Sequence, residues 1–209
     1  MPVAVVTDTT HYLPSGLVAE RGIGEVSLYT TQNGESTRES AIADLDGFYA
    51  GLRDESSLPS TSQPSVGDFL AVYEPLVAAG NDVVSIHLAG GISGTVESAR
   101  QAATIAAGDS GRRIDVVDSR MACGALGLVV LAASAAAGAG ASTDDVVARA
   151  GATRDALLRR FIFAVDTLEY LRRGGRIATA QAWVGGALKI KPILTLDGEI
   201  TPIERVRTS

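Results

Sequence analysis

Short apolar runs of strand length alternate along this chain with longer segments that have a helical pattern. Alternation of this kind is typical of a mainly parallel sheet covered by helices, because parallel strands need a long crossover connection. We therefore expect an α/β fold with helices on both faces of the sheet. The expected strands are residues 3–7, 26–30, 82–88, 114–117 and 161–165, and the expected helices are residues 45–52, 66–79, 95–107, 121–141 and 146–158.

The last part of the chain has a different pattern. Residues 190–196 and 200–206 are two β-rich runs around Asp197-Gly198, which predicts a hairpin with a type I′ turn. We expect a second, smaller α/β domain with antiparallel strands, so that residues 1–160 form one domain and 161–209 the start of another. Because a lone hairpin is not stable by itself, this second domain is expected to be incomplete. Upstream, Ser65 before Asp68 and Ser142 before Asp145 resemble capping boxes at helix starts.

Charge and cysteine content exclude several classes of protein. A formal net charge of −6 provides no basic field for nucleic acid. Cys123 is the only cysteine, so no disulfide or cysteine-based zinc site can form within the chain, and a reducing cytosol suits it. Residues 121–141 carry no charge, but Ala, Gly and Ser dominate them, which favours a buried helix over a membrane span. The N-terminus has no signal-peptide pattern, and we expect a cytoplasmic protein.

Candidate binding loops follow the expected strands, at the sheet edge where open α/β folds bind ligands. The sharpest is Gly90-Gly91-Ile92-Ser93-Gly94-Thr95, between a strand and a helix. Its glycines allow close approach of the backbone, and the following helix offers unpaired N–H groups and the positive end of its dipole. Ser93 and Thr95 add hydroxyl groups, so the loop could cradle a carboxylate or phosphate. The alternative is an ordinary turn with one of these hydroxyls as a helix cap.

Two further groups of polar residues have more than one interpretation. Thr61 and Ser62, in the stretch 60–65, could supply hydroxyls to the same anion, or the stretch could be a plain loop and cap. Aspartates end three of the expected strands and could bind Mg²⁺ or act in acid–base chemistry, although capping of loops is favoured because no histidine is adjacent in sequence. These are Asp8, Asp118 and Asp166.

Enzyme motifs are weak in this sequence. A serine hydrolase using Ser93 is the alternative that remains, but the stretch 91–95 lacks the last glycine of G-x-S-x-G. The two histidines, His11 and His87, both precede Ser93, opposite to the usual order on that fold, and are expected to be structural. No dinucleotide fingerprint follows the first strand, and no P-loop motif occurs anywhere. We expect no catalytic residue, no metal and no cofactor.

Several motifs together resemble the DegV family, in that family's order and spacing. They are TDTT at residues 7–10, TSQPS at 61–65, ISGT at 92–95 followed by Ser98-Ala99, VDS at 117–119, VDTLEYLRRGGRI at 165–177 and IKPIL at 190–194. The long stretch 165–177 and TSQPS are the most specific. The chain departs from the family at Thr9, where Ser is more common, and at residues 89–91; family members also continue well beyond the hairpin.

The resemblance implies a carrier of long-chain fatty acid such as palmitate, held in a tunnel between two α/β domains. Carried onto this chain, Thr61 and Ser93 would hold the carboxylate directly, and Ser62, Gly94 and Thr95 would support them. In some members, similar to FakB proteins, the carrier presents its fatty acid to a separate fatty acid kinase. Basic positions that match the family, for the head group or for kinase docking, are Arg176, Arg205 and Arg207.

Overall fold

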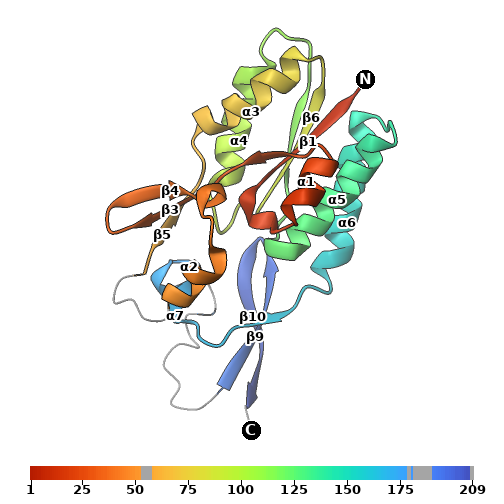
Figure 1. Ribbon diagram of the computed structural model, residues 1–209. Helices are drawn as coiled ribbons and strands as arrows, with labels where there is room; N and C mark the ends of the chain where they lie inside the picture. The colour runs from red at the N-terminus through yellow and green to blue at the C-terminus, as the bar shows by residue number, and fades with distance from the viewer. Residues whose placement is uncertain (53–57, 178–179, 181–189, 208–209) are drawn as a thin grey trace.

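A four-stranded parallel sheet forms the centre of the computed structural model, which describes residues 1–52, 58–177, 180 and 190–207 (Figure 1). The strand order is β2-β1-β6-β7. All six residues of β6 are buried, as expected for a central strand covered on both faces. The strands are β1 (Val3–Asp8), β2 (Gly24–Val26), β6 (Asp82–His87) and β7 (Ile114–Asp118).

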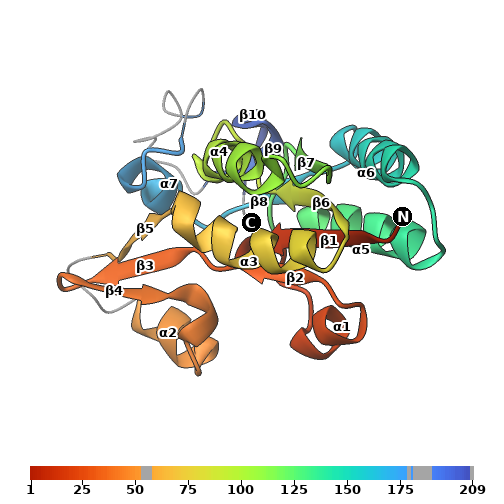
Figure 2. The same cartoon turned by 90° about the horizontal axis from the view of Figure 1, so that it is seen from above.

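Helices cover both faces of this sheet, which confirms the predicted fold class. On one face, Phe69 and Tyr73 of α3 pack with Ala99 of α4 against Val6 and Val83 of the sheet. On the other face, apolar residues of α5 and α6 enclose a separate core. Figure 2 shows these two layers on either side of the strands. The long helices are α3 (Val66–Ala78), α4 (Thr95–Ala107), α5 (Cys123–Gly138) and α6 (Thr143–Leu158); α1 (Ser15–Glu20) is short.

The predicted helix caps and the uncharged run lie in three of the long helices. Ser65 and Asp68 form a complete capping box at the start of α3, and Ser142 accepts a hydrogen bond from the N–H of Asp145 at the start of α6. Within the described ranges, no helix is long and apolar enough to cross a membrane. The uncharged run is instead α5, which packs against α6 and buries Leu126, among others.

An arm of three antiparallel strands, one α-helix and one short 3₁₀ helix projects from the end of β2 (Figures 1 and 2). The single strand predicted at residues 26–30 is wrong, because the chain leaves the parallel sheet after Val26 and pairs again in the arm. The type I′ signal there is Asn33-Gly34, where both residues have positive φ, 53° and 84°. Ser60–Ser62, expected to be loop, is the third strand of the arm. Its elements are β3 (Tyr29–Gln32), β4 (Glu35–Arg38), η2 (Glu39–Ala41), α2 (Leu45–Gly51) and β5 (Ser60–Ser62).

The C-terminal part forms a smaller antiparallel sheet of order β10-β9-β8, as the sequence predicts. Its hairpin turn is not type I′, because Asp197 lies opposite Glu199 and only Gly198, with φ 77°, has the positive φ that both central residues would need. Leu194 and Leu196 pack with Ala89 of the first part, so the two sheets share a core cluster. The elements are β8 (Phe163–Ala164), α7 (Glu169–Arg173), β9 (Ile190–Asp197) and β10 (Glu199–Arg207).

Candidate functional site

The glycine-rich loop at residues 90–95 follows β6 at the carboxyl edge of the parallel sheet. Four contacts from separate segments hold it. The N–H of Gly90 donates to the carboxylate of Asp118, the last residue of β7, and Arg176 Nε donates to the carbonyl oxygen of Ile92 at 3.1 Å. The turn of the β9–β10 hairpin also closes against the loop, because a β-carbon at Gly91 would collide with the backbone of Gly198. The fourth contact comes from Gln63, whose side chain lies against Gly94. The loop therefore lies where the two sheets meet.

The two hydroxyl groups of this loop lie together at the start of α4. Ser93 Oγ is 2.8 Å from Thr95 Oγ1 and accepts a hydrogen bond of 3.3 Å from the N–H of Thr95. Thr95 is fully buried, and Ser93 is partly exposed. The N-cap residue is Gly94, which brings no side chain to the helix end. A partly exposed hydroxyl next to a helix N-terminus is a suitable environment for a carboxylate.

Strand β5 places the other pair of predicted hydroxyls on different sides of the arm. Thr61 is opposite Thr30 in the register and Ser62 is opposite Tyr29. Since successive side chains of a strand point to opposite faces, Thr61 shares a face with Thr30 while Ser62 lies on the other face. Thr61 and Ser62 therefore do not present their hydroxyls side by side.

Gln63 connects the arm to the glycine-rich loop. Its side chain lies directly against Gly94, where a β-carbon would be within 2.6 Å of the Gln63 amide carbon. Its Nε2 donates a hydrogen bond of 3.3 Å to Ser98 Oγ in the first turns of α4. The segment that carries Thr61 and the loop that carries Ser93 are thus in contact. The contact lies two residues after Thr61 on one side and one residue after Ser93 on the other.

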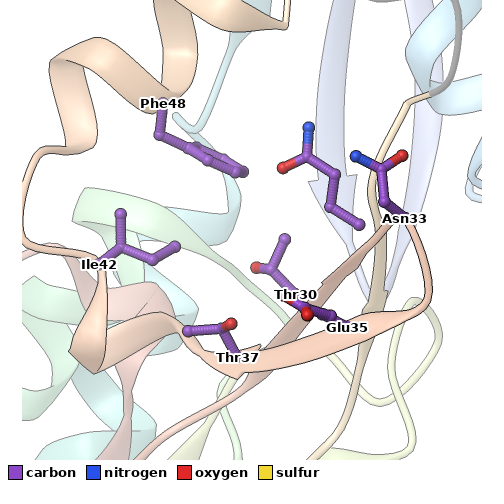
Figure 3. Close-up of a pocket in the computed structure, with 7 residues that line it drawn as sticks. Thr30, Asn33, Glu35, Thr37, Ile42 and Phe48 are labelled. Atoms are coloured by element: carbon purple, nitrogen blue, oxygen red, sulfur yellow. The ribbon is translucent and has the colours of Figure 1, made fainter.

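A pocket of about 240 Å³ lies between the arm sheet and α2 (Figure 3). Ile42 and Phe48 form its apolar side, and they face Thr30 and Thr37 across the space in Figure 3. Thr61 belongs to the same face of the arm sheet as Thr30. Polar side chains complete the lining: Gln32, Asn33 and Glu35.

Both histidines are engaged away from Ser93. His87 Nδ1 lies 3.0 Å from Asp8 Oδ2, and His87 Nε2 lies 2.6 Å from Ser85 Oγ, which also accepts a bond from Tyr73. This arrangement has the composition of a catalytic triad, but Asp8, Ser85 and His87 are each completely buried. His11 is also buried, and its ring contacts Glu25. No histidine among the described residues approaches Ser93, which argues against the hydrolase alternative.

The three strand-end aspartates have distinct partners. Asp8 caps the short helix η1 (Thr9–His11) and, contrary to the expectation from sequence, has His87 beside it. Burial alone would raise the pKa of Asp8, but hydrogen bonds from His87, Thr10 and Leu88 outweigh burial and hold that pKa below its ordinary value. Asp118 accepts from Gly90, and Asp166 pairs with Lys191 at 2.5 Å. The residues that the structure describes contain no group of acidic, histidine or cysteine side chains arranged for a metal.

The predicted basic residues have different environments. Arg176 is partly buried and donates to two backbone carbonyl groups, those of Ile92 and Gly174. Arg205 and Arg207 lie in β10, opposite Pro192 and Ile190, and their side chains fall outside the described residues. Arg176 is therefore the predicted basic residue that the structure brings to the glycine-rich loop.

Comparisons with known proteins show which family this chain belongs to. The family model described as "Uncharacterised protein, DegV family" matches residues 2–209. The chain belongs to the DegV family. It is 38% identical over 211 residues to Protein DegV of Bacillus subtilis, covering 100% of this chain and 73% of that protein.

Solved structures of other DegV proteins have the same fold. A fatty-acid-binding DegV family protein from Thermus thermophilus has a TM-score of 0.87 and 36% identity, covering 100% of this chain and 72% of that one. A stearic-acid-binding protein from Eubacterium ventriosum has a TM-score of 0.86 and 26% identity, covering 99% of this chain and 71% of that one. The DegV chains that this chain resembles are thus longer than the part it covers.

Proposed function

We propose that this DegV chain binds a long-chain fatty acid such as palmitate and acts as its carrier. The observation that carries the proposal is the convergence at the glycine-rich loop of Ser93, the start of α4, the Arg176 guanidinium and the arm that bears Thr61. Relatives of the same fold from Thermus thermophilus and Eubacterium ventriosum are described as fatty-acid-binding proteins. We place the carboxylate at this loop and the tail in a tunnel between the two α/β domains, 1–160 and 161–209.

The chemistry of the site suits a carboxylate head group. A desolvated carboxylate costs several kcal/mol unless donors meet it, and each charge-assisted hydrogen bond recovers about 1.5–3 kcal/mol. Ser93 and Thr61 are proposed to donate directly. Thr95, Gly94 and Ser62 are proposed to support them, with Ser62 acting through the position of β5 because its side chain lies on the other face. Arg176 adds a positive charge beside Ser93.

The acyl chain supplies most of the binding energy in this proposal. About fourteen methylene groups at about 0.8 kcal/mol each give roughly 11 kcal/mol, from which immobilising the ligand removes about 4 kcal/mol or more. The remainder corresponds to binding at about micromolar concentration. The head group then fixes the orientation of the ligand and distinguishes an acid from a neutral lipid.

Calorimetric titration with palmitate tests the head-group assignment. Thr61→Ala combined with Ser93→Ala should weaken binding about tenfold or more, because at least one hydrogen bond to a charged group is lost. Thr104→Ala is the matched control, since Thr104 is exposed on α4, the helix that follows Ser93, and its hydroxyl bonds to the backbone of Arg100. If the double variant binds palmitate with the same affinity as the control variant, Thr61 and Ser93 do not hold the carboxylate.

We further infer that the chain is not itself an enzyme and that a separate kinase, if one acts on the bound acid, supplies the phosphoryl chemistry in the cytoplasm. The sequence has no P-loop motif, so it carries no nucleotide-binding signature of that kind for the phosphoryl transfer itself. Incubating the purified chain with palmitate, Mg²⁺ and ATP should yield no acyl phosphate. Formation of acyl phosphate by the chain alone would contradict the carrier proposal.

A further inference from the structure

The side chain of Gln63 occupies the space that a β-carbon would need at Gly94. Gly94 has φ −77° and ψ 6°, a conformation open to any residue, so backbone strain does not explain a glycine at this position. A β-carbon at this position would overlap the carboxamide of Gln63, which would have to move to make room. The same carboxamide bonds to Ser98, which is 7% exposed. Gln63 is thus held by a steric contact and by a hydrogen bond, both at the start of α4.

We propose that Gln63 is a positioning residue that sets the spacing between Thr61 and Ser93, and that Gly94 is its socket. This inference rests on the proposed function, since it concerns the same carboxylate site. Gln63 follows Thr61 by two residues, and Gly94 directly follows Ser93. The contact between Gln63 and Gly94 therefore transmits the position of β5 to the loop that carries the second hydroxyl.

A carboxylate needs both donors at hydrogen-bond distance at once, whereas a neutral hydroxyl head group depends much less on them. Loss of the Gln63 contact leaves the hydroxyl groups of Thr61 and Ser93 present, but it lets the two segments that carry them move apart. The defect is therefore specific to ligands that carry a carboxylate. General loosening of the fold would weaken binding of any lipid with the same tail.

Two single variants should produce the same defect by different routes. Gln63→Ala removes the carboxamide, and Gly94→Ala keeps the N–H of residue 94 but displaces the carboxamide from its socket. Each should weaken palmitate binding about three- to tenfold, the worth of one neutral hydrogen bond. The double variant Gln63→Ala/Gly94→Ala should bind no more weakly than either single one, because the second change has nothing left to displace.

The experiment is a titration of wild type, both single variants and the double variant with palmitate and with hexadecanol. Hexadecanol affinity should change by less than about twofold in every variant. Gln101→Ala is the control, since Gln101 is exposed on α4 and its amide bonds to Glu97. Its palmitate affinity should equal that of wild type.

Three results would overturn the assignment of Gln63. They are wild-type palmitate affinity in Gln63→Ala, losses that multiply in the double variant, and equal losses for palmitate and hexadecanol. Each of these leaves fatty-acid binding by the wild-type chain intact. A wild-type chain that binds neither lipid would instead refute the proposed function, and the role of Gln63 with it.

Discussion

Replacing Asp8 by Asn should destabilise the chain far more than its small change in shape suggests. Donors surround the Asp8 carboxylate on all sides: Thr10 N–H and hydroxyl meet Oδ1, and Leu88 N–H and His87 Nδ1 meet Oδ2 at 3.0 Å. One hydrogen assignment satisfies the whole network, in which Tyr73 donates to Ser85, Ser85 to His87, and His87 to Asp8. With these hydrogen positions, asparagine must turn its –NH₂ group toward two donors, whichever way its amide lies.

The magnitude follows from burial. Asp8 and His87 are both 0% exposed, so water cannot replace a lost acceptor. Asparagine loses the two hydrogen bonds at one oxygen; each bond to a charged acceptor is worth about 1.5–3 kcal/mol, so the two together are worth about 3–6 kcal/mol of unfolding free energy. For a chain of 209 residues, each kcal/mol moves the melting temperature by about 2–4 °C, so we expect a decrease of roughly 6–24 °C.

Differential scanning calorimetry at neutral pH measures this effect. Asp109→Asn is the matched control because Asp109 is exposed, and its melting temperature should stay within about 2 °C of wild type. A variant Asp8→Asn that melts within the same margin would show that the buried carboxylate is not required. It would also refute the hydrogen assignment given above.

Three further predictions concern pH dependence, a close backbone contact and a helix cap. The pKa of Asp8 in the folded chain lies below its ordinary 3.8, so the stability that its charge contributes is present above that pH and is lost as the pH falls below about 4. The difference in unfolding free energy between wild type and Asp8→Asn, measured by urea titration, should therefore become smaller below about pH 4. A difference that stays constant with pH would contradict this. Gly91→Ala should lower the free energy of unfolding by about 1–3 kcal/mol in such titrations, because the new β-carbon presses on Gly198. Gly16→Ala in α1, with open space around it, should raise the free energy of unfolding by about 0.5–1 kcal/mol. Equal effects of the two variants would disprove the close approach of Gly91 and Gly198. Ser65→Ala should lower stability by about 1 kcal/mol through loss of the α3 cap, and an unchanged denaturation midpoint would exclude that cap.

The parallel core could be predicted from the sequence because its patterns are strong and local. Residues 82–88 contain four large apolar side chains, at positions 83, 84, 86 and 88, and the structure has β6 there. The helix predicted at residues 95–107 agrees with α4 at both ends. The capping box at Ser65 marks the start of α3 for the same reason, since it needs only two residues in one turn.

The arm could not be predicted from composition, because its strands are short and polar and their apolar neighbours lie elsewhere in the chain. Asn33-Gly34 is the signal that would have indicated its hairpin. Asp197-Gly198 has the same type of sequence, but Asp197 does not adopt positive φ there. The pairing of Ser60–Ser62 with Tyr29–Thr31 depends on contacts across a long separation in sequence, which local propensity does not encode.

The site shows the same division between local and distant information. The loop hydroxyls Ser93 and Thr95 could be found because glycines and a helix start surround them in sequence. The contact between Gln63 and Gly94 and the bond from Arg176 to Ile92 each join segments far apart in the chain, so only the fold reveals them. The domain boundary near residue 160 stays a prediction, and the shared core at Ala89 and Leu194 shows that the two parts pack together.

Native mass spectrometry of the chain purified from bacteria measures most directly whether it carries an acyl ligand. We expect a population heavier than the polypeptide by the mass of a long-chain fatty acid, lost on denaturation and reduced in Thr61→Ala/Ser93→Ala. A wild-type chain observed only at the mass of the bare polypeptide, even after incubation with palmitate, would contradict fatty-acid binding by this chain.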